Sequence, residues 1–95
     1  MSEIKEPIAQ RKLTAGTTVI TVTVGRPQRS GDDYSCPYCI EFGNAKRIGH
    51  AIGMDGVQAI QLAMRKIGVD LLATGSELGS AVSWLDVPGE TGFPT

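Results

Sequence analysis

The chain has 95 residues, and its nine basic and ten acidic side chains leave a formal net charge of −1. This length supports one domain with a single modest core and excludes two. The charges are scattered along the chain and form no basic stripe, so a nucleic-acid partner is not expected. We interpret the pairs of adjacent basic residues as parts of solvent-exposed faces.

The N-terminal segment, residues 1–7, mixes charged and small residues and has no apolar core, so no signal peptide is predicted. No apolar stretch approaches the roughly 20 residues that a membrane-spanning helix needs. We therefore expect a cytoplasmic protein without a membrane partner. In that reducing compartment the two cysteines are expected to be thiols.

Two strands are predicted near the start of the chain, over residues 8–14 and 17–24. The second is the stronger prediction, because every residue in it is β-branched and such residues favour the pleated backbone. Its Ile20, Val22 and Val24 share one face, and Val19 lies on the other.

A polar loop is predicted over residues 25–33, because Pro27, Gly31 and two adjacent aspartates are typical of turns. Binding residues concentrate on loops. We therefore expect a partner, most simply another protein, to contact this region. The candidate contact residues are Arg26, Arg29, Asp32, Asp33 and Tyr34.

A hairpin is predicted from a third strand, residues 36–42, and a fourth, residues 46–52. The apolar face of the third carries Cys36, Tyr38, Ile40 and Phe42, and that of the fourth carries Ile48, His50 and Ile52. The two faces coincide only if the connecting loop has an odd number of residues, which favours the three-residue loop 43–45. This register places Phe42 opposite Lys46, Ile40 opposite Ile48, and Tyr38 opposite His50.

Cys36-Pro37-Tyr38-Cys39 has the composition and spacing of the dithiol site of glutaredoxins. Such a site needs its first cysteine at a helix N-terminus, where backbone N–H groups and the helix dipole lower the thiol pKa. Residues 40–44 instead alternate between apolar and polar side chains and end in a Gly-Asn turn signal, a pattern typical of a strand. On a strand, Cys36 and Cys39 point to opposite faces, and Cys36 is expected to be buried. We interpret the match as coincidental and keep a thiol redox protein, with Cys36 as nucleophile and Cys39 as resolving thiol, as an alternative.

His50 is the only histidine. A lone histidine on an apolar strand face is more often buried and hydrogen-bonded than catalytic, and Tyr38 is its expected partner. Cys36 would lie diagonally from His50, but no third orienting group is visible. Cys36, Cys39 and His50 are zinc-ligand types, yet the second ligand pair of a structural site is missing. We therefore predict no metal and no cofactor, with a small zinc-binding domain as a further alternative.

A helix is predicted to begin after Asp55, an N-cap with Gln58 three residues later in a capping-box arrangement. A stop near Gly68 is expected, since glycine followed by valine is typical of a Schellman motif. Continuation to Thr74 is the alternative, at about 1 kcal/mol for an internal glycine. The expected apolar stripe comprises Val57, Ile60, Met64 and Ile67.

A last strand is predicted over residues 81–86, and residues 88–95, like residues 1–7, are expected to be an irregular tail. The predicted fold is α+β in one domain spanning residues 1–95. It is an antiparallel meander of four to five strands with one helix on one face, in the order β-β-β-β-α-β. Apolar residues left on the open face, such as Val19 and Tyr38, would then mark a partner or homodimer surface.

Several segments resemble a family of small uncharacterised bacterial proteins known only as a domain of unknown function. The segments are residues 55–64, residues 67–71, Gly25-Arg26-Pro27, Cys36-Pro37-Tyr38, Trp84 and Gly92-Phe93-Pro94. The resemblance implies a bacterial or phage origin and assigns no chemistry to any residue. Because the sequence specifies a fold well and shows no catalytic constellation, we expect a non-enzymatic binding module, of the inhibitor, immunity or accessory kind, that acts through protein–protein contacts.

Overall fold

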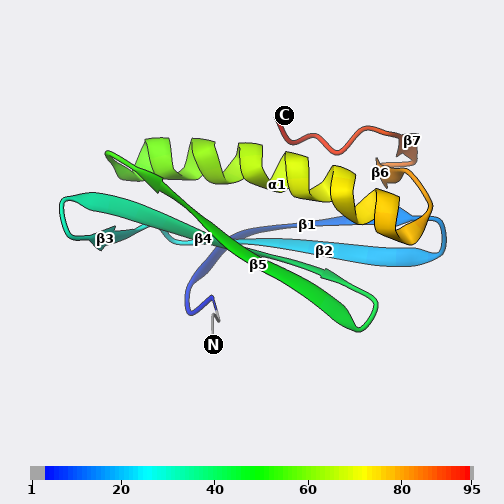
Figure 1. The fold of residues 1–95 in the computed structure, drawn as a ribbon, viewed down its shortest axis with the longest axis horizontal. Helices are drawn as coiled ribbons and strands as arrows, with labels where there is room; N and C mark the ends of the chain where they lie inside the picture. The colour runs from blue at the N-terminus through cyan, green and yellow to red at the C-terminus, as the bar shows by residue number, and fades with distance from the viewer. Residues whose placement is uncertain (1–3, 95) are drawn as a thin grey trace.

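A computed structural model describes residues 4–94 as an antiparallel sheet with one long helix on one face (Figure 1). The helix is α1 (Gly56–Leu78). The strands are β1 (Pro7–Ala15), β2 (Thr18–Gly25), β3 (Gln28–Ser30), β4 (Asp33–Phe42), β5 (Ala45–Gly53), β6 (Val82–Trp84) and β7 (Val87–Pro88). The predicted α+β class and the single helix after the main strands are confirmed.

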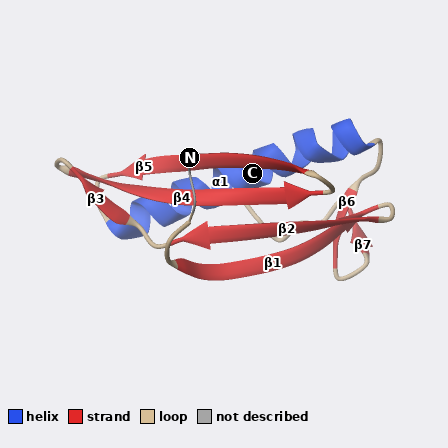
Figure 2. Cartoon of the chain, turned by 90° about the horizontal axis from the view of Figure 1, so that it is seen from below, coloured by secondary structure: helices blue, strands red, loops and turns tan. Residues whose placement is uncertain are grey.

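The long strand β4 organises the sheet. β5 pairs along one edge of β4, while β2 and then β3 pair along the opposite edge. β1 pairs with β2, and β6 extends the sheet beside the end of β1. Figure 2 shows the sheet from the side opposite α1, with the helix behind the strands and the N-terminal segment crossing in front of them. We call this side the outer face; residues 4–6 lie beside Ser35 and Pro37 on it.

The region predicted as an irregular loop, residues 25–33, contains β3 and the turn of a hairpin with β4, so that prediction is wrong. Val24 pairs with Tyr38, and Gln28 pairs with Ser35. Residues 25–27, between β2 and β3, therefore lie opposite only two residues of β4, 36 and 37. This is a bulge, and Pro27 lies within it because proline cannot donate to a ladder.

The three hairpins before α1 turn through two-residue loops that begin with glycine: Gly16-Thr17, Gly31-Asp32 and Gly43-Asn44. Each of these glycines has φ close to +60°: 61°, 63° and 59° in chain order. A two-residue turn with glycine first requires this left-handed conformation. The three-residue loop predicted between the third and fourth strands is therefore wrong.

The two-residue loop shifts the pairing of β4 with β5. Phe42 is opposite Ala45, Ile40 opposite Arg47, Tyr38 opposite Gly49, and Pro37 opposite His50. The predicted register, with Tyr38 opposite His50, is wrong by one residue. Ile48, His50 and Ile52 consequently lie on the outer face, whereas Tyr38 is buried beneath α1 and is not on the open face.

The isoleucines of β5 lie on the outer face because there is too little space for them between β5 and α1. A Cβ atom added at Gly53 would overlap the backbone N of Ala59, and one added at Gly49 would lie 2.5 Å from Oη of Tyr38. On the helix side, Ala59 and Ala63 are fully buried. Helix and strand therefore approach through small residues, and the isoleucines of β5 cannot occupy that face.

Helix α1 continues past Gly68, so the predicted stop there is wrong. Beyond Gly68 it buries Leu71 completely, and burying a leucine is worth about 1.5–3 kcal/mol, more than the roughly 1 kcal/mol cost of an internal glycine. The helix ends at the left-handed Gly79, where the N–H groups of Gly79 and Ser80 bond to the carbonyls of Ser76 and Gly75. This is a Schellman motif, placed eleven residues later than predicted.

The N-terminus of α1 largely follows the prediction. The Asp55 carboxylate accepts the N–H of Gln58 at 2.8 Å, while the Gln58 side chain accepts from the N–H of Met54 instead of Asp55. Ile60 and Ile67 face the core, but Val57 is 66% exposed and lies outside the apolar stripe. No helix in the part of the chain described is long and apolar enough to cross a membrane.

The C-terminal segment, residues 89–94, contains no helix or strand but is held in place. The Arg11 guanidinium lies 3.7 Å from the centre of the Trp84 ring and 5.0 Å from that of Phe93. Its Nη1 also donates to the Thr91 carbonyl at 3.1 Å. These contacts fix the segment beside α1, over the inner face of β1 (Figure 1).

Replacing Gly53 by alanine is expected to lower the free energy of unfolding by about 2 kcal/mol or more, because α1 must move away from β5. Chemical denaturation monitored by circular dichroism measures this change. Gly56→Ala is the matched control, since its Cβ would meet Pro27 at an ordinary 3.7 Å and alanine favours the helix. Equal stability of the two variants would contradict the close approach.

Candidate functional site

The residues predicted to contact a partner lie at one end of the sheet, and four of the five belong to the hairpin of β3 and β4. Arg26 is exposed and forms an ion pair with Glu6 at 3.1 Å, and Arg29 donates to the Gly31 carbonyl at 3.2 Å. Arg29 lies directly opposite Tyr34, which is half-buried and packs against the core. Asp32 and Asp33 are exposed at the turn that joins β3 to β4.

The two cysteines lie on opposite faces of β4. Cys36 is fully buried, and its thiol donates to the Gly25 carbonyl at 3.5 Å, whereas Cys39 is half-buried on the outer face. Burial raises the pKa of both thiols, and Glu41 raises that of Cys39 further. A dithiol redox centre needs converging thiols and a lowered pKa, and this arrangement supplies neither.

His50 is exposed on the outer face, opposite Pro37 and diagonal to Cys39. The expected hydrogen bond to Tyr38 and the diagonal position relative to Cys36 are both wrong, because both depended on the predicted register. Among residues 4–94, no three histidine, cysteine or acidic side chains are close enough together to hold a metal ion.

Tyr38 instead joins the sheet to the helix. Its hydroxyl donates to Oδ2 of Asp70 at 2.5 Å, passing over the bare backbone of Gly49. Burial raises the pKa of Tyr38, and the hydrogen bond to Asp70 raises it further. A phenol that holds its proton this firmly is a poor general acid, so we interpret the contact as structural.

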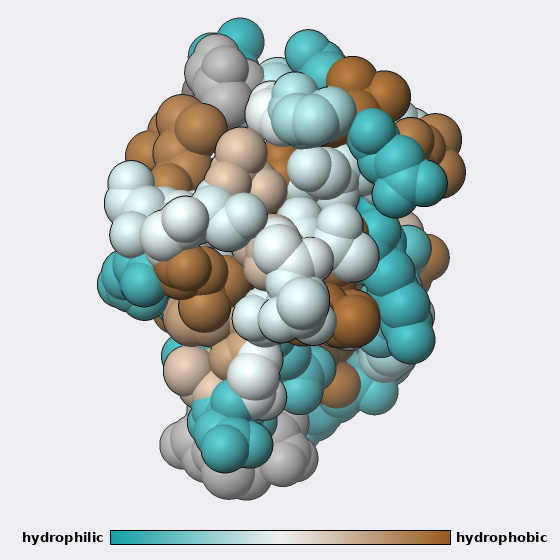
Figure 3. All heavy atoms as spheres, turned by 90° about the vertical axis from the view of Figure 1, so that its right-hand side faces the viewer, coloured by the Kyte–Doolittle hydropathy of each residue, from teal (hydrophilic) through white to brown (hydrophobic). Residues whose placement is uncertain are grey.

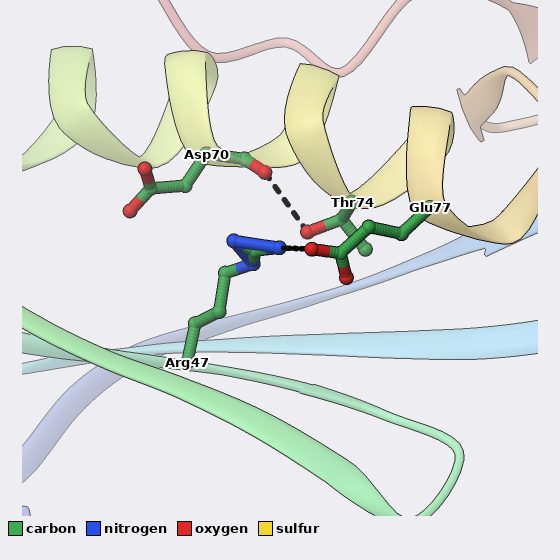
Figure 4. A network of polar contacts seen from close by, with 4 residues as sticks. All are labelled: Arg47, Asp70, Thr74 and Glu77. Carbon is green, nitrogen blue, oxygen red and sulfur yellow. Dashed lines mark hydrogen bonds and ion pairs between the residues drawn. The ribbon is translucent and has the colours of Figure 1, made fainter.

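A second connection lies beside it. Arg47 extends from β5 between Asp70 and Glu77 of α1 and forms an ion pair with Glu77 (Figure 4). The Thr74 hydroxyl, fully buried, donates to the Asp70 carbonyl at 2.8 Å. The ion pair joins the C-terminal half of α1 to β5, while the Thr74 hydrogen bond lies within the helix.

The outer face carries an apolar strip along β4 and β5. Ile48 and Ile52 are 43% and 46% exposed, and they alternate with His50 on β5. Cys39 lies opposite Ile48, and Pro37 lies opposite His50, both half-buried. We call these five residues the outer strip. The sequence contained a signal for it, because glycine at positions 49 and 53 marks the face of β5 that has no room for side chains.

A groove of about 360 Å³ lies between the C-terminal half of α1 and the C-terminal segment, with Leu71, Gly75 and Thr91 in its lining. Its polar groups are hydroxyls and backbone atoms, and no titratable side chain among residues 4–94 lines it. It can hold a small apolar group but supplies no acid, base or nucleophile beyond hydroxyls.

Replacing Tyr38 by phenylalanine is expected to cost about 2 kcal/mol at neutral pH, since a hydrogen bond to a carboxylate is lost. The pKa of Tyr38 is raised above its ordinary value of 10.0. Its contribution to stability is therefore complete below pH 10 and falls as the pH rises above it, because the unfolded chain loses the proton first. Denaturation between neutral pH and pH 11.5 should show this fall in wild type and in a Tyr34→Phe control, and not in Tyr38→Phe.

A native mass spectrum of the unreduced protein should give the bare mass with both thiols intact, because Cys36 and Cys39 face away from one another. A mass lower by two hydrogens would mean that the strand opens to form a disulfide. A mass raised by one zinc ion would revive the metal alternative. The same spectrum reports whether two copies associate.

Residues 9–95 match the family described as Domain of unknown function (DUF6968). No curated protein and no solved structure matches the chain. The family match covers α1 and nearly all of the sheet, and it confirms the resemblance to an uncharacterised family. The chain belongs to the DUF6968 family.

Proposed function

We propose that this chain is a small non-enzymatic binding module, of the inhibitor, immunity or accessory kind, that acts in the cytoplasm through contacts with another protein. The observation that carries the proposal is the outer strip. Its two isoleucines are nearly half exposed on a strand whose other face carries only glycine and alanine apart from Arg47. Exposed aliphatic residues gathered on one uncovered sheet face are typical of a protein contact surface.

Polar groups border the outer strip. Glu41 and Lys46 lie directly opposite one another at one end of it, and Ser35 lies opposite Ile52 at the other. An apolar centre with a polar rim is the usual composition of a protein interface. His50, in the middle of the strip, can donate or accept a hydrogen bond to a partner.

Other exposed apolar residues are less suited to this role. Leu72, Leu85 and Val87 are about half exposed or more, around the end of the molecule where α1 stops and β6 and β7 lie. Figure 3, which faces this end, shows the hydrophobic residues separated by residues of intermediate hydropathy and by hydrophilic ones. The outer strip, in contrast, is continuous across two paired strands.

Replacing Ile48 and Ile52 together by glutamate should abolish capture of a partner by the immobilised protein from an extract of its source cells. Both side chains point away from the core, so the melting temperature should change little. Leu85→Glu, an exposed change at the far end, is the control and should capture the partner as wild type does. Loss of capture with both variants, or a substrate-dependent activity without any partner, would contradict the proposal.

A further inference from the structure

The outer strip borders a free strand edge. Among the described residues β5 pairs only with β4. In a hairpin closed by a two-residue loop, the pair beside the loop is hydrogen-bonded and the bonding alternates from there. The odd-numbered residues of β5, from Ala45 to Gly53, therefore bond to β4. The backbone N–H and C=O groups of Ile48, His50 and Ile52 point away from the sheet.

One hydrogen bond agrees with this assignment. Lys66, on the flank of α1, donates from Nζ to the His50 carbonyl at 2.7 Å. A carbonyl directed to the free edge is open to such a side chain. Lysine at an edge is a common means of preventing uncontrolled strand pairing, and here it occupies one carbonyl at the middle of β5.

The helix flank above this edge carries unneutralised positive charge. Arg65, Lys66, Val69 and Asp70 line a hollow of about 240 Å³ there. Asp70 already accepts the Tyr38 hydroxyl, and Glu77 is paired with Arg47. Among residues 4–94, Arg65 and Lys66 take part in no ion pair. Arg65 and Lys66 outnumber Asp70, the one acidic residue in this lining, so the net formal charge of the hollow is positive.

We infer that the free edge of β5 binds an extended acidic segment of a partner protein as an added strand. The inference rests on the proposed function and names its site and ligand. Main-chain bonds to Ile48, His50 and Ile52 would supply affinity, as in other cases of strand addition. A second copy of this chain fits less well, because it would bring the same cationic flank against itself.

The geometry also specifies a sequence pattern for the segment. Alternate side chains of an added strand point to opposite faces. One set lies beside Ile48 and Ile52 and extends the outer strip, so it should be apolar. The other set lies on the helix side, near Arg65 and Lys66, so it should be acidic. Binding releases the Lys66 ammonium from the His50 carbonyl to pair with a carboxylate.

The probe is a capped seven-residue peptide in which glutamate and valine alternate, titrated into the ¹⁵N-labelled full chain. Saturable shifts of the Ile48, His50 and Ile52 amide resonances are expected. A peptide with lysine in place of glutamate, and one of the same composition in scrambled order, should bind about tenfold more weakly or worse. Equal shifts with all three peptides, or none at residues 46–52, would overturn the inference.

Two variants locate the site. Ile48→Pro removes an N–H that faces solvent, a change that edge strands tolerate, and should abolish peptide binding, while Ile48→Val should retain it. Lys66→Glu reverses an exposed helix charge and should weaken binding of the acidic peptide about tenfold or more. Lys12→Glu makes the same change in net charge on β1, three strands from β5, and should have no effect.

The inference and the proposed function can fail separately. If Ile48→Pro and Lys66→Glu both leave peptide binding unchanged, the edge is not the site, whatever the partner. If a captured partner is lost with the Ile48/Ile52 glutamate variant but kept with Ile48→Pro and Lys66→Glu, the outer strip binds it without strand addition and the inference is wrong. Loss of the partner with all three supports both.

Discussion

The close approach of α1 to β5 is the constraint on which the rest of the structure depends. It is possible because Gly49, Ala51 and Gly53 present almost no side chain to the helix. The helix side of the contact is equally small, since Ala59 and Ala63 are the residues of α1 buried there. Dispersion and burial at such short separation stabilise the pairing only while no side chain intrudes. Every larger residue of β5 must therefore point to the outer face or, like Arg47, reach past the helix.

The same constraint determines how the second layer is completed. With α1 placed over β4 and β5, the inner face of β1 needs another cover (Figure 1). The C-terminal segment provides it, held by the contacts of Arg11 with Trp84 and Phe93. One helix and one irregular segment together cover a face that is too wide for the helix alone.

Local patterns predicted the elements well, because they depend on neighbours in the sequence. The β-branched run at 17–24 became β2, and the Asp55 carboxylate caps α1 as expected. The hairpin register was predicted wrongly because Ile48 and Ile52 indicate one face of β5 as buried, whereas Gly49 and Gly53 mark the other face as the one that packs against α1. Hydrophobic alternation normally identifies the buried face of a strand, but here steric exclusion by Tyr38 and Ala59 outweighs it. The loops carried a usable signal, since Gly-Asn and Gly-Asp are typical of two-residue hairpins.

The proposed strand-addition site could not be predicted because its parts come from different elements. Lys66 meets His50 only once α1 lies along β5. The candidate sites that the sequence indicates, the 25–33 region and the Cys-Pro-Tyr-Cys motif, are recognised from local composition. Local composition does not reveal which strand will have a free edge; that follows from the order of strands in the sheet.

The Cys-Pro-Tyr-Cys motif has a structural explanation in this sheet. Proline is rare in a central strand because it leaves a carbonyl on the neighbouring strand without a donor. If the register of β2 with β4 is continued, that carbonyl belongs to Gly25, where the bulge begins. The buried Cys36 thiol donates to this same carbonyl at 3.5 Å. The cysteine therefore replaces the bond that Pro37 cannot make, and the motif that imitates a redox centre is a way of passing proline through the middle of a sheet.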